Sequence, residues 1–308
     1  MSQRQRFADH LTAPDATAMR RQWRAPVIGI ALMAAASLLL PLVDGMAKVL
    51  MADHAPILVA WARYAAAALA IAPLILIRGR GLVPARTGLA VNLLRTVLLV
   101  ASMVCFFLAL PSVPLATALG GYFIAPVAAA VLAACLLGER LTARRLAAVA
   151  LGLAGALFIL RPGAESGHGA ALALLSGLLF AGYLVATRAT AVTMPAIEAL
   201  VVQSLLGAVL LTPLALLNWS WPDARGLVLM AAMGVLSLFC HLMAIAAFRR
   251  AETAVLSPLV YLELVTAVLF GWWFLSERPD AGAVAGIALI VLAGLAALSG
   301  RRPQGRIA

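Results

Sequence analysis

Residues 115–141 read LATALGGYFIAPVAAAVLAACLLGERL, and this stretch decides the fold. A helix of about 20 apolar residues is long enough to cross the hydrocarbon core of a bilayer. Here the apolar run ends in Leu137-Gly138-Glu139-Arg140, which predicts that the helix leaves the apolar phase at that point. Pro126 interrupts the run and predicts a bend with freed backbone carbonyls. We interpret the stretch as one bent membrane-spanning helix.

The end of this stretch recurs later in the chain. Leu275-Ser276-Glu277-Arg278 repeats Leu137-Gly138-Glu139-Arg140 at an offset of 138 residues (277 − 139 = 138). A Leu-Ala-Gly triplet follows each copy, at 153–155 and at 292–294. The sequence therefore predicts two tandem halves of similar structure.

Apolar runs separated by charged residues, proline or glycine predict ten spans in all. They lie near 26–50, 56–77, 88–110, 115–137, 146–160, 169–187, 196–217, 227–248, 254–276 and 282–299. Because each half then has an odd number of spans, the second half must insert upside down relative to the first. We expect an all-α integral membrane protein of two inverted repeats, 26–160 and 167–299, with tails at 1–25 and 300–308.

The composition is typical of a protein whose main solvent is lipid. Hydrophobic residues make up 64% of the 308 positions and charged residues only 11%, against roughly 25% in an ordinary soluble domain. The net charge of +11 could favour nucleic acid as a partner, but the basic residues stand between apolar runs rather than on a solvated face. We therefore expect the lipid bilayer as a partner and no nucleic acid.

The distribution of arginine predicts the orientation. With the N-terminus in the cytoplasm, most arginines outside the spans fall in cytoplasmic segments, and the opposite segments contain Arg161, Arg225 and Arg278. This asymmetry agrees with the positive-inside rule. We expect a multi-pass protein of a bacterial inner membrane with both termini in the cytoplasm, and a first span that is not a cleaved signal peptide.

The quoted residues resemble a known family. Leu-Ala-Thr-Ala at 115–118, Ala-Pro at 125–126 and Leu-Gly-Glu-Arg-Leu at 137–141, followed by a glycine-rich helix, resemble the EamA repeat of the drug/metabolite transporter superfamily. The second half resembles the same repeat from Ala247 to Arg278. The resemblance implies ten helices in two EamA repeats and a carrier of amino acids, vitamins, nucleotide-like cofactors, purines or drugs.

The first span carries a further resemblance. Asp44 and Lys48, together with an arginine early in the second span, look similar to the branch that contains S-adenosylmethionine and riboflavin uptake carriers. This likeness implies a substrate of the vitamin or nucleotide-like kind.

Charged side chains within spans are functional candidates, because each costs several kcal/mol in the bilayer unless it is paired or hydrated. Asp44 and Lys48 are four residues apart on one helix face and could pair with each other. Arg63 lies at a similar depth in the outer half of the second span. These residues predict one polar cluster, which either contacts substrate or forms a structural ion pair beside an anchoring arginine.

A second group is predicted on the other side of the midplane. The depths of Arg95, His241 and Glu263 overlap within about one helical turn. If they face one cavity, Glu263 could exchange a proton, Arg95 could hold an anionic group and His241 could titrate near neutrality. The alternatives are an Arg95 that extends toward the cytoplasm and a His241 that is simply buried. Glu263 has no evident structural partner in the sequence.

Tyrosines within the spans are further candidates. Tyr122 and Tyr261, with Tyr183, each need a partner or water for a buried hydroxyl. As the lining of a cavity they would favour a planar or amphipathic substrate. Packing in the core is the alternative.

The sequence predicts a secondary transporter that moves a small organic metabolite by alternating access. It contains no GxxxxGK[ST] phosphate loop, no HExxH and no CxxC cluster, so we expect no ATP hydrolysis, metal or cofactor. Proton coupling through Glu263 is a hypothesis. The alternatives are an exporter of drugs or waste metabolites and, more remotely, a membrane-embedded enzyme. We expect a monomer or homodimer.

Overall fold

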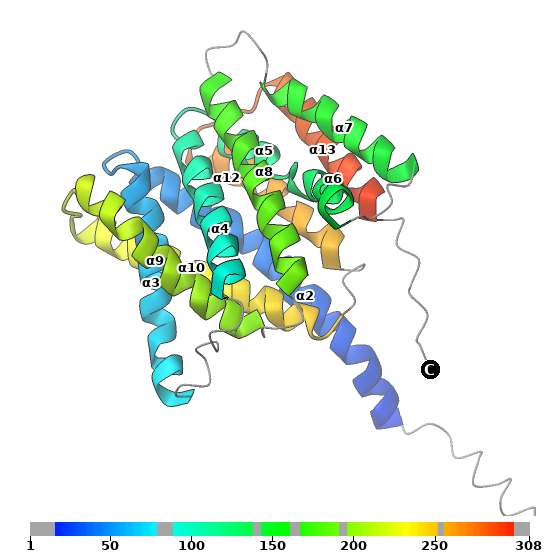
Figure 1. Cartoon of the computed structure of the whole chain (residues 1–308), viewed down its shortest axis with the longest axis horizontal. Helices are drawn as coiled ribbons and strands as arrows, with labels where there is room; N and C mark the ends of the chain where they lie inside the picture. Colours follow the sequence, from blue (N-terminus) through cyan, green and yellow to red (C-terminus); the bar gives the residue numbers. More distant parts are fainter. Residues whose placement is uncertain are drawn as a thin grey trace, which may run out of the picture.

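A computed structural model describes residues 16–78, 89–137, 143–160, 167–190, 196–251 and 256–298, which fold into a helical bundle (Figure 1). The first half of the chain forms α2 (Ala16–Leu50), α3 (Pro56–Arg78), α4 (Leu89–Ala109), α5 (Leu115–Tyr122), α6 (Ala125–Leu137) and α7 (Ala143–Leu160). The second half forms α8 (Gly167–Thr190), α9 (Ala196–Leu217), α10 (Ala224–Phe248), the 3-10 helix η3 (Ser257–Tyr261), α12 (Leu262–Phe274) and α13 (Ala281–Leu298).

Helical backbone coincides with each of the ten predicted apolar runs, with shifts at the ends. Helix α2 begins at Ala16, within the stretch that was expected to be a tail, and the rest of that tail and residues 300–308 lie outside the described residues. Helix α7 begins at Ala143, so the shortest predicted run gains part of a turn. Helix α10 begins at Ala224 because the carboxylate of Asp223 caps it by accepting from the amide of Gly226 at 2.7 Å.

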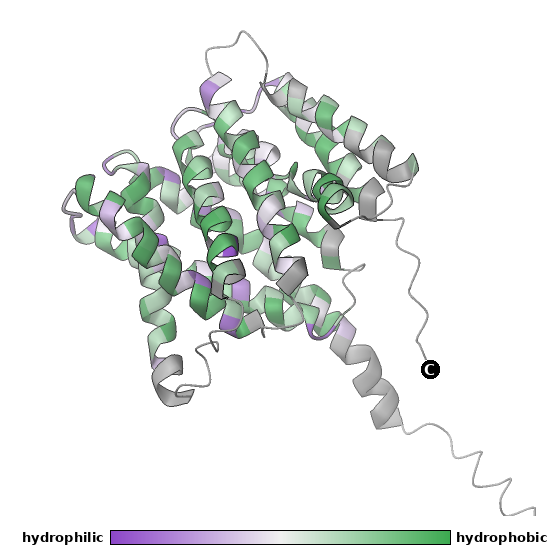
Figure 2. Cartoon of the chain, viewed as in Figure 1, coloured by the Kyte–Doolittle hydropathy of each residue, from purple (hydrophilic) through white to green (hydrophobic). Residues whose placement is uncertain are grey.

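Six of the described helical segments are long and apolar enough to cross a membrane. They are Pro26–Leu50, Pro56–Pro73, Leu115–Leu136, Gly167–Thr187, Ile197–Leu217 and Ala224–Phe248. Three shorter apolar helices run over Leu93–Ala109, Leu259–Phe274 and Ala281–Ala293. Figure 2 shows hydrophobic residues along most of the helical ribbons, which fits a protein that lies in a bilayer.

The outer surface is strongly apolar. Trp221, Leu217 and Trp273 are 86%, 81% and 77% exposed, and Leu69 and Phe274 are similarly open. Large side chains in such numbers would drive association in water, whereas they suit contact with lipid tails. The fold therefore belongs to a membrane protein.

The run 115–137 is broken in the middle, as Pro126 predicted. The amide of Phe123 bonds to the carbonyl of Leu119 at 2.9 Å and the amide of Ile124 to that of Gly121 at 3.3 Å, and α6 then starts afresh at Ala125. Pro126 has no amide hydrogen and so cannot continue the ladder of α5. Phe123 and Ile124 are 4% and 5% exposed, so the break is sheltered from lipid.

The run 254–276 is altered at the corresponding place. Residues Ser257–Tyr261 form a 3-10 helix with a proline in its first turn, and α12 continues from Leu262. A 3-10 turn leads the backbone into the helix at a tighter pitch. Leu256 and Tyr261, at the two ends of this segment, are 0% and 9% exposed, so it is also sheltered by other helices.

The main helix contacts join the two halves of the chain. Helix α2 packs on α10 and α4 packs on α8, while α3 packs on α9 and α7 on α13. Helices α5 and α12 also touch, and α7 and α13 lie side by side at one flank of the molecule (Figure 1). The largest apolar core, which includes Val43, Phe107, Leu115 and Met233, fills the centre. The interface between the halves is thus the core of the protein.

Candidate functional site

A cavity of about 470 Å³ lies between the two halves. On α8 and α10 the lining residues belong to the C-terminal half of the helix, and on α9 they belong to the N-terminal half. The lining contributed by these three helices is therefore displaced toward the end of the molecule at which α8 and α10 finish. Its polar lining residues are Arg63, Tyr64, Tyr122, Tyr183, Gln203, Ser204, Ser237, His241, Tyr261 and Glu263.

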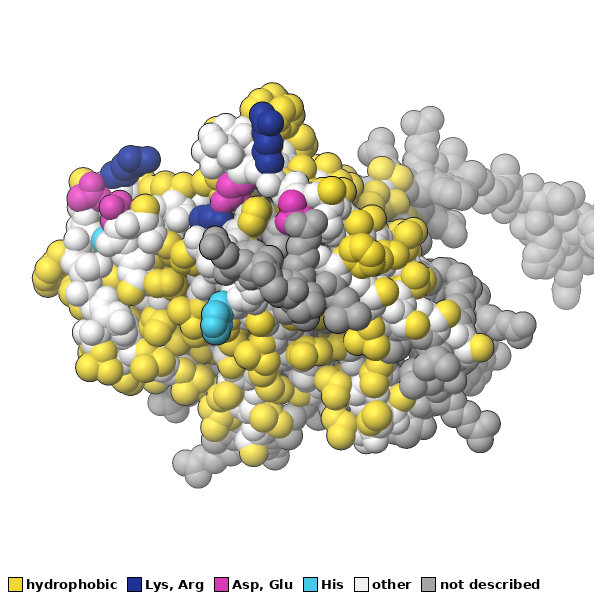
Figure 3. All heavy atoms as spheres, turned by 90° about the horizontal axis from the view of Figure 1, so that it is seen from above, with side chains coloured by type: hydrophobic (Ala, Val, Ile, Leu, Met, Phe, Trp, Pro, Cys, Tyr) yellow, Lys and Arg dark blue, Asp and Glu magenta, His cyan; other side chains and the backbone are white. Residues whose placement is uncertain are grey.

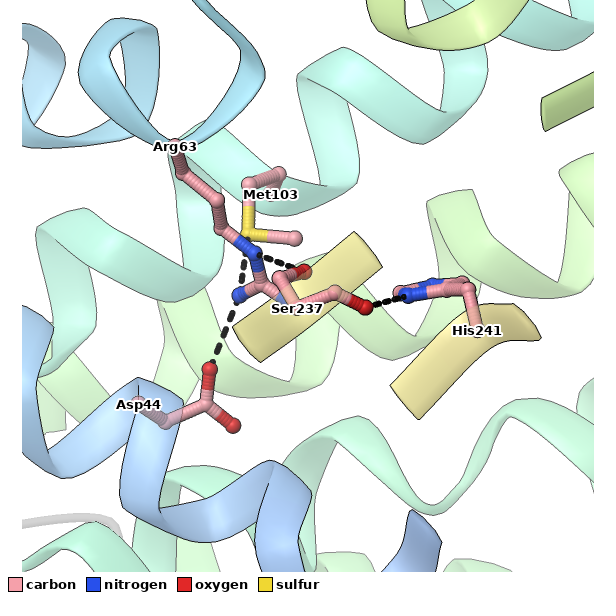
Figure 4. A network of polar contacts seen from close by, with 5 residues as sticks. All are labelled: Asp44, Arg63, Met103, Ser237 and His241. Carbon is pink, nitrogen blue, oxygen red and sulfur yellow. Dashed lines mark hydrogen bonds and ion pairs between the residues drawn. The ribbon is translucent and has the colours of Figure 1, made fainter. Parts of the chain in front are cut away.

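A buried ion pair stands at the wall of this cavity. Arg63 Nη1 on α3 donates to Asp44 Oδ1 on α2 at 2.9 Å. Arg63 Nε donates to the hydroxyl of Ser237 on α10 at 3.0 Å, and Nη1 lies 3.5 Å from the sulfur of Met103. Figure 4 shows Asp44, Met103 and Ser237 converging on the guanidinium. The pair therefore ties α2, α3 and α10 together.

His241 belongs to the same network. Its Nδ1 lies 2.7 Å from the carbonyl oxygen of Ser237, one turn earlier on α10 (Figure 4). Because a carbonyl can only accept, Nδ1 carries the hydrogen, and Nε2 is the remaining polar atom of the ring. The sequence had placed Arg63 and His241 in separate groups at different depths, and that separation was wrong. Helices α3 and α10 pack so closely at Gly234 that the two side chains share Ser237.

Glu263 is the remaining carboxylate of the cavity. It lies in the first turn of α12 and is 8% exposed. It also lines a smaller adjoining space of about 50 Å³ together with Asp44, Arg63 and Tyr122. Among the described residues, the structure contains no hydrogen bond or ion pair to its carboxyl group. Glu263 thus faces open space beside an arginine whose charge Asp44 balances.

Aromatic rings form much of the remaining wall. Phe180 stacks on Tyr183 at 5.3 Å and 18° and lies 4.7 Å from Tyr122. Phe123 of the first half and Tyr261 of the second half pair at 5.5 Å. The hydroxyls of Tyr64 and Tyr261 are buried, and within the described residues neither has a hydrogen-bond partner. A buried hydroxyl without a partner is uncommon, and neither hydroxyl is open to the cavity in the described state.

Arg95 is not among the residues that line the cavity. Its guanidinium lies 5.8 Å from the centre of the Tyr183 ring, and Nη2 donates to the carbonyl of Ala199 at 3.4 Å. The side chain is 3% exposed, so it does not extend into the cytoplasm either. Arg95 therefore supports the aromatic wall from behind, joining α4 to α8 and α9.

Lys48 does not pair with Asp44, so that predicted pair is wrong. Its ammonium instead forms an ion pair with Glu277 and donates to the carbonyl of Val113. The second oxygen of Glu277 accepts from the amide of Leu115 at 2.8 Å. Asp44 and Lys48 share a helix face as residues i and i+4. Asp44 nevertheless bonds to α3, whereas Lys48 bonds to the loops before α5 and after α12. The two charges thus belong to different networks.

Sequence reasoning missed several residues of these networks. Glu277 was interpreted only as a marker of the repeat, although its charge at the end of an apolar run could have suggested a partner for Lys48. Ser237 lies one turn before His241, and this spacing was an available signal. Gln203, which accepts from the Tyr183 hydroxyl at 3.3 Å, and Phe180 carry no motif that distinguishes them from core residues.

The described residues contain no group of three or more His, Cys, Asp or Glu side chains that could hold a metal ion. Cys105, Cys135 and Cys240 form no disulfide with one another. The chemistry of the cavity is therefore that of hydrogen bonds, aromatic surface and a few charges.

The sequence model of the EamA-like transporter family matches this chain twice, over residues 27–161 and 167–299. The chain is 30% identical to the pseudopaline exporter CntI of Pseudomonas aeruginosa strain UCBPP-PA14, over 72% of this chain and 79% of that protein. It is 33% identical to the riboflavin transporter of Rhizobium johnstonii, over 66% of this chain and 68% of the relative.

Two further comparisons extend this result. The chain is 25% identical to the S-adenosylmethionine uptake transporter of Rickettsia conorii, over 65% of this chain and 69% of that protein. A solved structure described only as a crystal structure of a protein has the same fold, with a TM-score of 0.61 at 21% identity. That likeness covers 91% of this chain and 99% of the solved chain.

We predict that Asp44→Asn and Arg63→Gln each lower the melting temperature in detergent. Each change leaves one charge buried without its counter-ion, which costs about 3–5 kcal/mol in soluble proteins. The double variant should lose less than the sum of the two single losses, because it removes both charges together. Asp53→Asn, in an exposed turn, is the control. Strictly additive losses would contradict a coupled pair.

Proposed function

The chain belongs to the EamA-like transporter family, and we propose that it carries a small organic metabolite across the bacterial inner membrane as a secondary transporter. The observation that carries the proposal is the central cavity, which both halves of the chain line and which contains a carboxylate, Glu263, that has no partner among the described residues. Transporters of inverted-repeat architecture hold their substrate at such a place between repeats. A cavity of about 470 Å³ suits a metabolite of ordinary size.

We propose that the chain crosses the membrane ten times, as two inverted repeats of five helices over 26–160 and 167–299. The pattern of contacts supports this arrangement. Exchanging the halves turns the α2–α10 contact into the α8–α4 contact and maps the α3–α9 and α7–α13 contacts onto themselves. The two matches of the family to the chain are consistent with the same division. The arginine distribution supports cytoplasmic termini.

The substrate belongs to the amino acids, vitamins or nucleotide-like cofactors in this proposal. Relatives named for riboflavin and S-adenosylmethionine support the last two classes. The relative named as a pseudopaline exporter supports the second candidate function, export of a metabolite. A monomer or homodimer would serve either direction, and no cofactor is part of the proposal.

We propose that the protein works by alternating access and that the described state is closed at the outer end. Figure 3 views this end, where acidic and basic side chains lie among the connecting loops. Here Glu277 of the second half binds both Lys48 and the amide of Leu115 in the first half. Trp61 donates to Thr212 at 3.0 Å beside the Trp219 ring, and His54 bonds to Ser220 at 2.6 Å. The cavity lining on α8, α9 and α10 is displaced toward the opposite end, which this proposal makes the cytoplasmic one.

The proposed function predicts saturable binding and exchange. The purified protein should show a raised melting temperature with one class among amino acids, S-adenosylmethionine, flavins, nucleosides and polyamines, because a ligand of the native state stabilises it. The same class should exchange by counterflow in proteoliposomes. Absence of exchange by any stabilising ligand would overturn the proposal. Chemical turnover of a ligand in detergent would instead support a membrane-embedded enzyme.

Proton coupling through Glu263 predicts that an imposed pH gradient alters net transport by the native protein and has no effect on Glu263→Gln. Asp44, Arg63 and His241 are the ionisable neighbours, and Asp44 and Arg63 balance each other. Glu198→Gln, on α9 outside the cavity lining, should respond as the native protein does. Unaltered transport and pH response in a well-inserted Glu263→Gln protein would remove the hypothesis.

The outer closure predicts a charge-dependent change in access. In a protein without the three native cysteines, Met103→Cys beside Arg63 should react slowly with a membrane-impermeant thiol reagent added outside. Lys48→Glu should accelerate labelling by about fivefold or more, because like charges at Glu277 repel, and adding Glu277→Lys should restore slow labelling.

A surface control keeps this experiment interpretable. Trp221→Cys, at a position 86% exposed near the same end, should label at one rate in all backgrounds. Equal labelling of Met103→Cys in all three backgrounds would show that the Lys48–Glu277 pair does not control access.

A further inference from the structure

We propose that the cavity selects solutes that join a planar ring system to a positively charged group, and that Glu263 is the ion partner of that group. This inference rests on the proposed transport function and names its substrate class. The charges, the aromatic rings and the polar atoms of the described lining residues support this selectivity.

The charges of the cavity leave one carboxylate unbalanced. Arg63 and Asp44 form a pair at 2.9 Å, and a second nitrogen of Arg63 is bound to Ser237, so this cation is already engaged. Glu263 has no comparable partner among the described residues, although it is 92% shielded from solvent. A carboxylate in an apolar surrounding is costly unless a cation or a proton reaches it. A cationic solute would remove that cost, whereas an anionic one would add to it.

The other polar atoms of the cavity also favour a cationic solute. His241 donates its Nδ1 hydrogen to the Ser237 carbonyl, so in the neutral ring Nε2 can only accept. Gln203 Oε1 accepts from Tyr183, which leaves the amide nitrogen of Gln203 for the ligand. The site therefore offers acceptors toward a positively charged group and an adaptable contact for the edge of a ring.

The walls are suited to the planar part of the solute. The lining contains the stacked pair of Phe180 and Tyr183, the neighbouring Tyr122, and the pair of Phe123 and Tyr261. Aromatic side chains bind planar rings by offset stacking and attract cations through their faces. Arg95 fixes Tyr183 from behind at 5.8 Å, so this wall is held in place without adding a positive side chain to the lining.

Two matched pairs of probes test the proposal with the full-length protein in detergent. S-adenosylmethionine carries a sulfonium charge that S-adenosylhomocysteine lacks, and N-methylquinolinium carries a ring charge that quinoline lacks at pH 8. We expect the cationic member of at least one pair to bind about tenfold or more tighter, which is about 1.4 kcal/mol. Glu263→Gln should abolish that preference, because it should weaken binding of the cationic probe and leave binding of the neutral probe unchanged.

Two variants control for folding and for charge. Glu263→Asp keeps the carboxylate and should keep the preference, and Glu198→Gln should behave as the native protein. The proposal is overturned if neither cation is preferred, including the case in which none of the four probes binds, or if the preference survives Glu263→Gln.

Vesicle exchange separates this inference from the transport function. If riboflavin or another neutral ligand exchanges by counterflow while no cation is preferred, only the selectivity inference fails. If no ligand that binds is exchanged, the transport function itself fails.

Discussion

The fold depends on one constraint, which is that the bilayer core supplies no water to satisfy a backbone amide or carbonyl. Continuous helices meet this demand within a single segment, and the long apolar runs of the sequence leave little else available. The breaks before α6 and at η3 are tolerated because they are covered by other helices, as the low exposure of Phe123 and Ile124 shows. Both breaks border the cavity through Phe123, Tyr261 and Glu263. The irregular backbone thus occurs where the protein needs polar surface and where lipid does not reach.

The same constraint sorts the charged side chains. A buried charge must find a counter-ion, so Asp44 bonds to Arg63 and Lys48 bonds to Glu277. Each pair joins different helices, and each therefore fixes tertiary structure as well as neutralising charge. Arg95 has no counter-ion among the described residues; Nη2 donates to the carbonyl of Ala199, the guanidinium lies near the ring of Tyr183, and Nε has no hydrogen-bond partner there. Glu263 likewise has no protein partner among the described residues, and because it lines the cavity, this is the strongest reason to assign it a role in binding.

The sequence predicted the helices well and the side-chain partners poorly, for physical reasons. Hydropathy is local, so the apolar runs and the breaks at Pro126 and Pro258 could be read along the chain. Depth along a helix is also local, and it correctly brought Asp44 near Arg63, although it wrongly separated Glu263 from them. Partner choice is not local: the i, i+4 spacing of Asp44 and Lys48 cannot show that α3 and the loop beyond α12 each approach one of them. The shared Ser237 likewise required knowledge of how α10 crosses α3.

Helices α2 and α12 connect the cavity to the outer closure. On α2, Asp44 takes part in the cavity network and Lys48, one turn later, takes part in the closure. On α12, Glu263 lies at the start of the helix and Glu277 follows its end, where Ser276 adopts a left-handed backbone (φ 54°) and the amide of Glu277 returns to Gly271 at 2.8 Å. The two helices pack tightly between these points, because a Cβ at Gly45 would collide with Phe270. In the proposed alternating access, a displacement of either helix that opens the proposed outer end would therefore also move a charged residue of the cavity, which is the coupling that such a mechanism requires.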